Sequence, residues 1–295
     1  MSKYFLMILS ASGGAGHRQA GEALLRAAQR LRHRCTAEHY DCLDFTSPVF
    51  KSLYAGSYLH MVNRAPAVWG YMYERTERRR METHGLLKLF DRFNYRRLLR
   101  EILDRKPDAL VCTHFLPYLS ISHSLRSLRP DLPVYAATTD FDAHQYWIDP
   151  VVRRYYVYHQ ESAWQLHAKG VSADRIRVTG IPVLPGFARH GSRPAARRRL
   201  AIPREAFTIL FLSGGFGTGR MEETTGHLLS VLQHLAPRRF NVLIVCGRNE
   251  RLRELLDRSV FPPNVTARVF GFVDNMHDFM HASDVLVSKA GGLTS

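Results

Sequence analysis

Residues 4–31 read YFLMILSASGGAGHRQAGEALLRAAQRL, and this stretch decides the fold of the chain. The apolar run over 4–9 is typical of a buried strand, and the small residues over 10–16 predict a tight turn. Beyond the turn, alanine and leucine recur at helical spacing over 20–31, with charged residues on the opposite face. The pattern predicts a strand, a glycine-rich loop and an amphipathic helix.

The loop brings His17 to the start of the predicted helix. Glycines allow a sharp turn and the close approach of a ligand. The unpaired N–H groups of a helix N-terminus carry a partial positive charge that suits an anion. The loop is not a dinucleotide fingerprint, because Gln19 stands where the third glycine belongs, and no P-loop lysine follows. Taken alone, a histidine at a helix start is about as often structural as functional.

Composition limits the classes of function. The chain has 295 residues, enough for one large or two medium domains, and a formal charge of +15. A basic chain suits nucleic acid, an anionic membrane or an anionic substrate, or simply has solvated arginine faces. The sequence carries no RNA-binding aromatic motif and no zinc-finger spacing, so we expect no nucleic acid partner. Its four cysteines form no C-x-x-C pair and are interpreted as reduced core residues.

The first apolar run is too short for a signal peptide and is interpreted as a strand. No apolar run is as long as a membrane span, which needs about 18 residues. We therefore expect a cytoplasmic protein.

Strands and helices alternate along the rest of the chain. Strands are predicted over 35–41, 108–112, 133–137, 155–158, 176–179, 208–212, 241–246, 268–270 and 285–287. Helices are predicted over 86–104, 116–128, 163–169, 223–235, 249–256 and 276–281. This alternation implies parallel α/β crossovers. Prolines and glycines over 180–186 predict a boundary between domains 1–182 and 183–295.

Residues 45–100 combine many aromatic side chains with clustered arginines. Two interpretations stay open. The aromatic residues and the arginines together suit an interfacial surface that meets an anionic membrane. Alternatively, the aromatic residues belong to the core and the arginines form a solvated face.

Several motifs in order resemble the monogalactosyldiacylglycerol synthase family, whose relatives include processive diacylglycerol glucosyltransferases. The motifs are LSASGGAGHRQA (9–20), TD (139–140), GIPV (180–183), SGGFG (213–217), GFVDNM (271–276), ASD (282–284) and SKAGG (288–292). Each motif is weak alone, and the ordered set covers nearly the whole chain. The resemblance implies two Rossmann-like domains facing a cleft, the B-type glycosyltransferase architecture.

The resemblance also implies an enzyme, a UDP-sugar-dependent hexosyltransferase. It would transfer the sugar, with inversion and without a metal ion or cofactor, to a lipid hydroxyl on the cytosolic face of the membrane. The implied catalytic residues are His17 and Asp140. The implied acceptor-binding residues are Gly14, Gly16, His114 and Trp147. The implied donor-binding residues are Gly214, Gly215, Phe216, Gly217, Phe272, Val273, Asn275, Met276, Gly291 and Gly292.

Inverting transfer needs a base for the acceptor proton and positive potential on the leaving diphosphate. His17 can be the base with Asp140 orienting it, or Asp140 can be the base with His17 donating to the diphosphate. The sequence leaves both open.

The family continues past the SKAGG motif, whereas this chain stops at Ser295. We therefore expect an incomplete second domain, in a chain that can be inactive. Two other functions stay open. One is a UDP-sugar epimerase of the same architecture, and the other is a basic membrane-binding module with a vestigial site.

Overall fold

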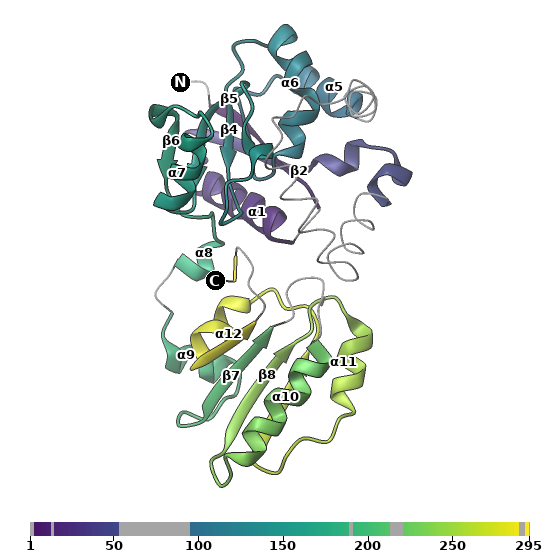
Figure 1. Cartoon of the computed structure of the whole chain (residues 1–295), viewed down its shortest axis with the longest axis vertical. Coiled ribbons are helices and arrows are strands. Elements are labelled where there is room, and N and C mark those ends of the chain that lie inside the picture. The colour runs from purple at the N-terminus through teal and green to yellow at the C-terminus, as the bar shows by residue number, and fades with distance from the viewer. Residues whose placement is uncertain are drawn as a thin grey trace. The chain divides into compact units, whose positions relative to one another are not determined.

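The computed structural model describes residues 3–12, 15–52, 95–188, 191–212, 221–288 and 293–294. These residues belong to two compact units, Met1–Pro185 and Gly186–Ser295. Each unit is a parallel sheet covered by helices, which confirms the predicted α/β class (Figure 1). Within the described ranges, no helix is long and apolar enough to cross a membrane.

The first unit contains a six-stranded parallel sheet in the order β2-β1-β3-β4-β5-β6. The strands are β1 (Tyr4–Ser10), β2 (Cys35–Asp41), β3 (Ala109–Cys112), β4 (Val134–Ala137), β5 (Val152–Val157) and β6 (Ile176–Val178). The helices are α1 (Ala15–Arg30), α5 (Arg96–Arg105), α6 (Leu116–Leu128) and α7 (Gln160–Ala168). The short helix α8 (Pro185–Ala188) begins at the last residue of this unit and continues into the second. Short 3₁₀ turns are η1 (Cys42–Phe45), η2 (Gln145–Trp147) and η3 (Ala173–Arg175). The unit's predicted elements appear within a few residues of their expected bounds, except that the structure describes only the end of the helix expected over 86–104.

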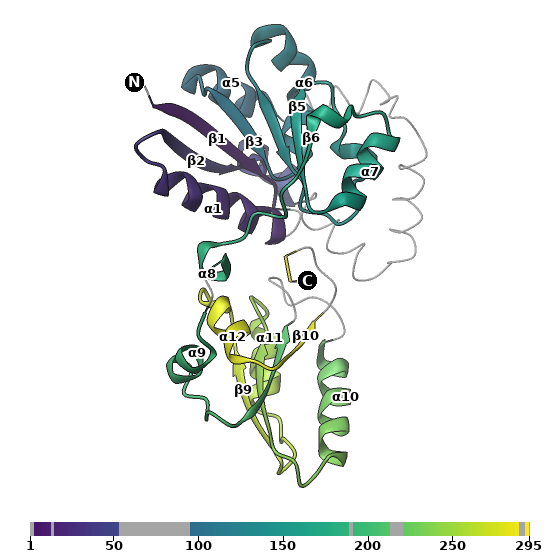
Figure 2. The same cartoon turned by 90° about the vertical axis from the view of Figure 1, so that its left-hand side faces the viewer.

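The core of the first unit forms because apolar side chains of the strands meet the apolar faces of the helices. Figure 2 shows the sheet between α1 on one side and α5 and α6 on the other. Met7 and Leu9 of β1 and Leu98 of α5 have no exposed surface in this cluster. All four cysteines are buried and unpaired, as the sequence indicates. Most of the aromatic and arginine-rich segment, residues 53–94, lies outside the described residues.

The second unit contains a four-stranded parallel sheet in the order β10-β7-β8-β9. The strands are β7 (Phe207–Leu212), β8 (Phe240–Val245), β9 (Val265–Phe270) and β10 (Val285–Ser288). The helices are α9 (Arg193–Arg199), α10 (Met221–His234), α11 (Glu250–Asp257) and α12 (Met276–Ala282). Alternate residues of β7 and β8 enter two separate cores, one with α10 and α11 and the other with α9 and α12. The central strands β7 and β8 are therefore buried on both faces, as strands of parallel sheets usually are.

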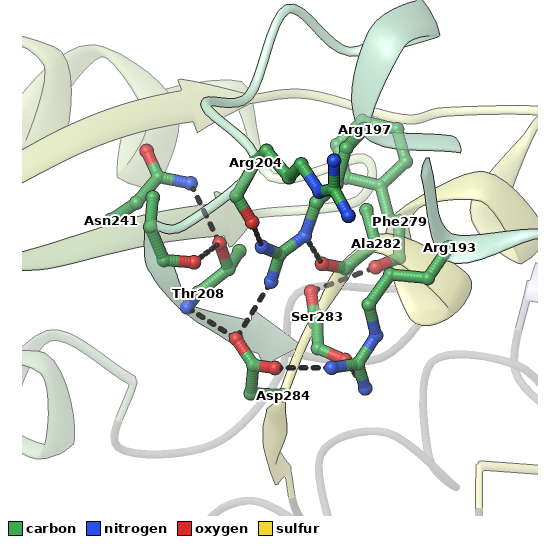
Figure 3. Close-up of polar contacts among 10 residues, drawn as sticks. Arg193, Arg197, Arg204, Thr208, Asn241, Phe279, Ala282, Ser283 and Asp284 are labelled. Atoms are coloured by element: carbon green, nitrogen blue, oxygen red, sulfur yellow. Dashed lines mark hydrogen bonds and ion pairs between the residues drawn. The ribbon is translucent and has the colours of Figure 1, made fainter. Parts of the chain in front are cut away.

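A buried arginine links the first helix of the second unit's core, α9, to the chain just after α12 (Figure 3). Arg197 of α9 is only 6% exposed. Its guanidinium donates to the Ala282 carbonyl at 3.0 Å, to Asp284 at 2.8 Å and to the Arg204 carbonyl. The same Asp284 carboxylate accepts from the backbone N–H of Thr208 at 2.8 Å and from Arg193 at 2.5 Å. Arg193 and Arg197 therefore anchor α9 to the end of α12 and the start of β7, a role that the sequence analysis did not assign.

Gly21 of α1 is required by its contact with His39 of β2. A Cβ atom at Gly21 would lie 2.3 Å from Nε2 of His39. The ring cannot move freely, because Nε2 also bonds to Ser10 Oγ at 2.9 Å and the side chain is only 11% exposed. Residue 21 therefore has to be glycine if α1 is to pack this closely on the sheet.

We expect Gly21→Ala to lower the free energy of unfolding of the first unit by about 1–3 kcal/mol, the usual cost of overpacking. In a His39→Ala background the same substitution should instead stabilise by up to about 1 kcal/mol, because alanine is the better helix former. Urea unfolding followed by tryptophan fluorescence measures both changes, since all three tryptophans, Trp69, Trp147 and Trp164, belong to the first unit. Equal effects in the two backgrounds would contradict the packing argument.

Candidate active site

The topology of the first sheet fixes where a ligand can bind. The chain passes from β1 to β2 on one side and then crosses to β3 on the other side of β1. In open parallel sheets, ligands bind at such a reversal, beyond the carboxyl ends of the strands. His17 follows β1 and His114 follows β3, so both lie at this reversal. The next strand, β4, is followed by Thr139 and Asp140.

His17 lies in the first turn of α1 and is fixed through both its backbone and its ring. The hydroxyl of Thr113 donates to the backbone carbonyl of His17 at 2.8 Å. Nδ1 of His17 lies 3.0 Å from the Thr113 carbonyl and 2.6 Å from Thr139 Oγ1. A carbonyl oxygen only accepts hydrogen bonds, so in the neutral ring Nδ1 carries the proton and Nε2 carries the lone pair. The imidazole is therefore arranged to accept a proton at Nε2.

His114 is a buried, neutral neighbour of His17. The two rings meet edge to face with their centroids 4.4 Å apart. Nδ1 of His114 accepts the N–H of Leu116 at 3.0 Å, at the start of α6. Burial lowers the pKa of His114 well below its ordinary value, and the charge of His17 lowers it further. The His114 ring is therefore kept neutral.

The low pKa of His114 predicts acid sensitivity of the first unit. Below about pH 6.5 the unfolded chain binds a proton that the folded chain excludes. The free energy of unfolding should therefore fall as the pH drops through this range, by up to about 1.4 kcal/mol per pH unit for each such histidine. Partly buried His39, whose pKa burial also lowers, contributes with the same sign.

His114→Asn tests this prediction, because an asparagine oxygen can still accept from the first turn of α6. We expect the variant to lose the contribution of one histidine to the slope of unfolding free energy against pH. Urea unfolding by tryptophan fluorescence, from about pH 5 to 8, measures the slope. A slope equal to that of the unsubstituted chain would contradict the assignment.

Asp140 is held by Trp147. The indole N–H of Trp147 donates to Oδ2 of Asp140 at 2.8 Å, and Tyr118 donates its hydroxyl to the Trp147 carbonyl at 2.8 Å. Trp147 has no exposed surface and packs on the Phe115 ring, with centroids 5.7 Å apart. The sequence analysis placed Trp147 among the acceptor-binding residues. The correction is that Trp147 positions Asp140 from within the core, because a buried ring has no surface to offer a ligand.

The ring of His17 is oriented by Thr113 and Thr139, whereas the sequence analysis considered Asp140 for this role. Asp140 instead belongs to the same cluster through Trp147, whose ring lies 6.4 Å from that of His114. Gly16 lies within the first turn of α1, one residue before His17. Gly14 lies outside the described residues.

The carboxyl edge of the second sheet carries the described part of the expected donor site. Phe272 follows β9 and is 52% exposed, with the Arg248 guanidinium 5.2 Å from its ring centre. Val273 and Met276 pack partly buried against the core. Asn275 donates to Asp278 at 3.3 Å at the start of α12. The remaining predicted donor residues, Gly214, Gly215, Phe216, Gly217, Gly291 and Gly292, lie outside the described residues.

Sequence reasoning missed Thr113 as a support of His17 and Arg248 as a neighbour of Phe272. Both could have been found from their place in the sequence, because Thr113 directly follows the strand β3 and Arg248 lies just after the end of the strand β8. Among the residues that the structure describes, no group of three or more His, Cys, Asp or Glu side chains is placed to hold a metal ion.

Comparison with known proteins identifies the family to which the sequence is similar. Residues 17–183 match the family model described as monogalactosyldiacylglycerol (MGDG) synthase. A processive diacylglycerol beta-glucosyltransferase of Staphylococcus epidermidis is 24% identical over 295 residues, covering 98% of this chain and 71% of the relative. The Staphylococcus aureus enzyme of the same name is 25% identical over 300 residues, with the same coverage.

Two solved structures share the fold. Acinetobacter baumannii MurG superposes with a TM-score of 0.57 at 16% identity, covering 99% of this chain and 74% of that one. The UDP-GlcNAc 2-epimerase of Neisseria meningitidis, bound to UDP-GlcNAc, gives a TM-score of 0.56 at 13% identity, covering 98% and 78%. At these identities the likeness concerns the fold alone.

Proposed function

Since the chain belongs to the monogalactosyldiacylglycerol synthase family, we propose that it transfers a hexose from a UDP-sugar to the hydroxyl of a diacylglycerol-type lipid. The match of the family model over 167 residues, from 17 to 183, supports this class of reaction. The observation that carries the proposal is the fixed ring of His17, whose Nδ1 faces the Thr113 carbonyl at 3.0 Å. That contact leaves the basic nitrogen, Nε2, for the acceptor hydroxyl.

The proposed reaction inverts the anomeric carbon in one displacement. The acceptor oxygen attacks the face opposite the UDP oxygen, the bond to that oxygen breaks, and UDP leaves with the electron pair. Nε2 of His17 takes the hydroxyl proton as the new bond forms. Positioned acid–base groups of this kind accelerate reactions by about 10²–10⁴-fold. Asp140 is assigned to the same site, where its charge favours the protonated form of a nearby base.

The other proposed contacts divide between acceptor and donor. Gly14 and Gly16 border the acceptor hydroxyl, whereas His114 is buried and contacts the His17 ring instead. For the donor, Phe272, Val273, Asn275 and Met276 hold the uracil, and the glycine-rich loops 213–219 and 291–292 bind the diphosphate. Backbone N–H groups in such loops and at helix N-termini stabilise a leaving diphosphate without a metal ion. We therefore propose that UDP-sugar is a substrate and that no cofactor is needed.

Incubation of the chain with UDP-glucose or UDP-galactose and diacylglycerol tests the function. Lipid products are read by mass spectrometry and nucleotide-sugar products by chromatography. The proposal requires a hexosyl-diacylglycerol whose formation depends on the UDP-sugar. Conversion of the UDP-sugar into another UDP-sugar, with no lipid product, would support an epimerase instead and contradict the transferase.

We further propose that the enzyme works as a peripheral protein on the cytosolic face of an anionic membrane. The formal charge of +15 supports this, since basic residues near an anionic bilayer contribute about 1 kcal/mol each. Flotation with vesicles of phosphatidylglycerol and phosphatidylcholine, or of phosphatidylcholine alone, tests it. We expect binding to the anionic vesicles that weakens as salt is added. Equal binding to both kinds of vesicle would contradict an electrostatic contact.

A further inference from the structure

Three polar groups meet at one nitrogen of His17. Nδ1 lies 2.6 Å from Thr139 Oγ1 and 3.0 Å from the Thr113 carbonyl oxygen. Thr139 Oγ1 itself lies 3.3 Å from the same carbonyl oxygen. Thr139 is only 5% exposed, so its hydroxyl is confined to these partners by its surroundings. The three atoms form a closed triangle behind the ring.

Only one proton arrangement satisfies this triangle. The carbonyl oxygen accepts and has no proton to give, so the Thr139 hydroxyl donates to it. The hydroxyl oxygen then offers a lone pair to Nδ1, and Nδ1 must carry the proton. In the reverse arrangement, Thr139 would donate to an unprotonated Nδ1. The lone pair of that nitrogen would then point at a lone pair of the Thr113 carbonyl oxygen, only 3.0 Å away, and the two would repel. The Thr113 carbonyl therefore selects the ring form that carries its lone pair on Nε2. The Thr139 hydroxyl, which donates to the same carbonyl, adds a second acceptor for the Nδ1 proton.

We propose that Thr139 is a positioning residue that, together with the Thr113 carbonyl, holds the tautomer and orientation of His17. In Ser-His-Asp hydrolases a carboxylate holds the corresponding nitrogen of the base. Here the nearby carboxylate, Asp140, accepts the Trp147 indole N–H at 2.8 Å. A neutral relay, from Nδ1–H through the Thr139 hydroxyl to the Thr113 carbonyl, takes the place of the charged partner.

The relay has a second support in the backbone. The Thr113 hydroxyl donates to the His17 carbonyl at 2.8 Å, so one residue holds the main chain of His17 and, with its own carbonyl, the ring. The ring can then rotate only by breaking the Nδ1 contacts, and among the described residues Thr139 is the one whose hydroxyl takes part in them. Thr139 therefore supplies a second acceptor for the Nδ1 proton, whereas Thr113 fixes the main chain of His17 and supplies the first acceptor.

Substitution at residue 139 separates these roles. Thr139→Val keeps the shape and removes the hydroxyl, and Thr139→Ser keeps the hydroxyl. The matched control is Thr138→Val, because Thr138 is equally buried, at 1% exposed, and its hydroxyl donates to the Tyr156 carbonyl at 3.4 Å, not to His17. Each variant is prepared as the whole chain with ¹⁵N-labelled histidine. The His17 signals are assigned by their loss in His17→Ala.

The tautomer of His17 is read by two-bond ¹H–¹⁵N correlation, which distinguishes a protonated from an unprotonated ring nitrogen. We expect protonated Nδ1 and bare Nε2 in the unsubstituted chain, in Thr139→Ser and in Thr138→Val. Thr139→Val should show a mixture of tautomers. A His17 ring protonated at Nε2 in the unsubstituted chain, or a Thr139→Val spectrum identical to that of Thr138→Val, would overturn the proposal.

The catalytic consequence rests on the proposed function. If His17 is the base, Thr139→Val should lower kcat for hexose transfer by about 10-fold or more, as loss of an orienting partner usually does. Thr139→Ser should restore it, and KM for the UDP-sugar should change little. A tautomer shift in a chain that makes no glycolipid would uphold the positioning role and contradict the proposed function, so the two failures are distinguishable. Unchanged kcat in an active Thr139→Val enzyme would overturn the positioning role.

Discussion

His17→Ala should lower the rate of hexose transfer to diacylglycerol by about 10²-fold or more, the usual scale for loss of an acid–base group. The Thr113 carbonyl fixes the imidazole through Nδ1 and leaves Nε2 as the proton acceptor. Removing the imidazole therefore removes a proton acceptor whose orientation is set before the substrate binds. The acceptor hydroxyl must then lose its proton to water during the displacement. Initial rates of glycolipid formation at saturating UDP-sugar measure the loss as a change in kcat.

The control for this prediction is a histidine outside the site. His123 of α6 is exposed, and His123→Ala should keep the rate of the unsubstituted chain. Tryptophan fluorescence of both variants checks that the first unit is folded. Asp140→Asn should also lower the rate by about 10²-fold, because it removes a negative charge from the same cluster. Unchanged rates in both His17→Ala and Asp140→Asn would exclude the proposed chemistry.

Arg197→Ala should destabilise the second unit by about 3–5 kcal/mol, the typical cost of removing one partner of a buried ion pair. Arg197 is 6% exposed, and its guanidinium is shared by Ala282, Arg204 and Asp284. Truncation removes the donor to the buried Ala282 carbonyl and one of the cations that balance Asp284. The unpaired groups, more than the lost attraction, account for most of the cost.

The matched control is Arg198→Ala, next along α9, where the arginine is exposed and the expected change is within about 0.5 kcal/mol. Because the second unit has no tryptophan, hydrogen exchange of peptides from β7 and β8 is the suitable measurement. Exchange in Arg197→Ala should be faster in both strands. Equal protection in the two variants would show that the arginine is not the anchor that Figure 3 depicts.

Local pattern predicted the framework of both sheets, because the information is contained in neighbouring residues. The stretch 4–31 shows its buried strand and amphipathic helix directly, and β1 and α1 appear where it places them. The meeting of His17 and His114 also follows from the sequence, since side chains that end adjacent parallel strands share one edge.

Features that depend on distant partners could not be predicted. Arg197 looks like its neighbours in a basic run, and only the fold brings it to Asp284, 87 residues away. The family resemblance implied Trp147 as an acceptor contact, but the depth of its side chain is set by Phe115 and Tyr118. Likewise, the contact of Thr139 with His17 spans 122 residues and leaves no local trace.

Chemical rescue tests the role of His17 most directly. Hexosyl-diacylglycerol formation by His17→Ala is measured with and without added imidazole, over a range of pH. If the His17 ring is the base, added imidazole should restore transfer in proportion to its unprotonated fraction. A rate for His17→Ala that equals that of the unsubstituted chain before any imidazole is added would contradict the account.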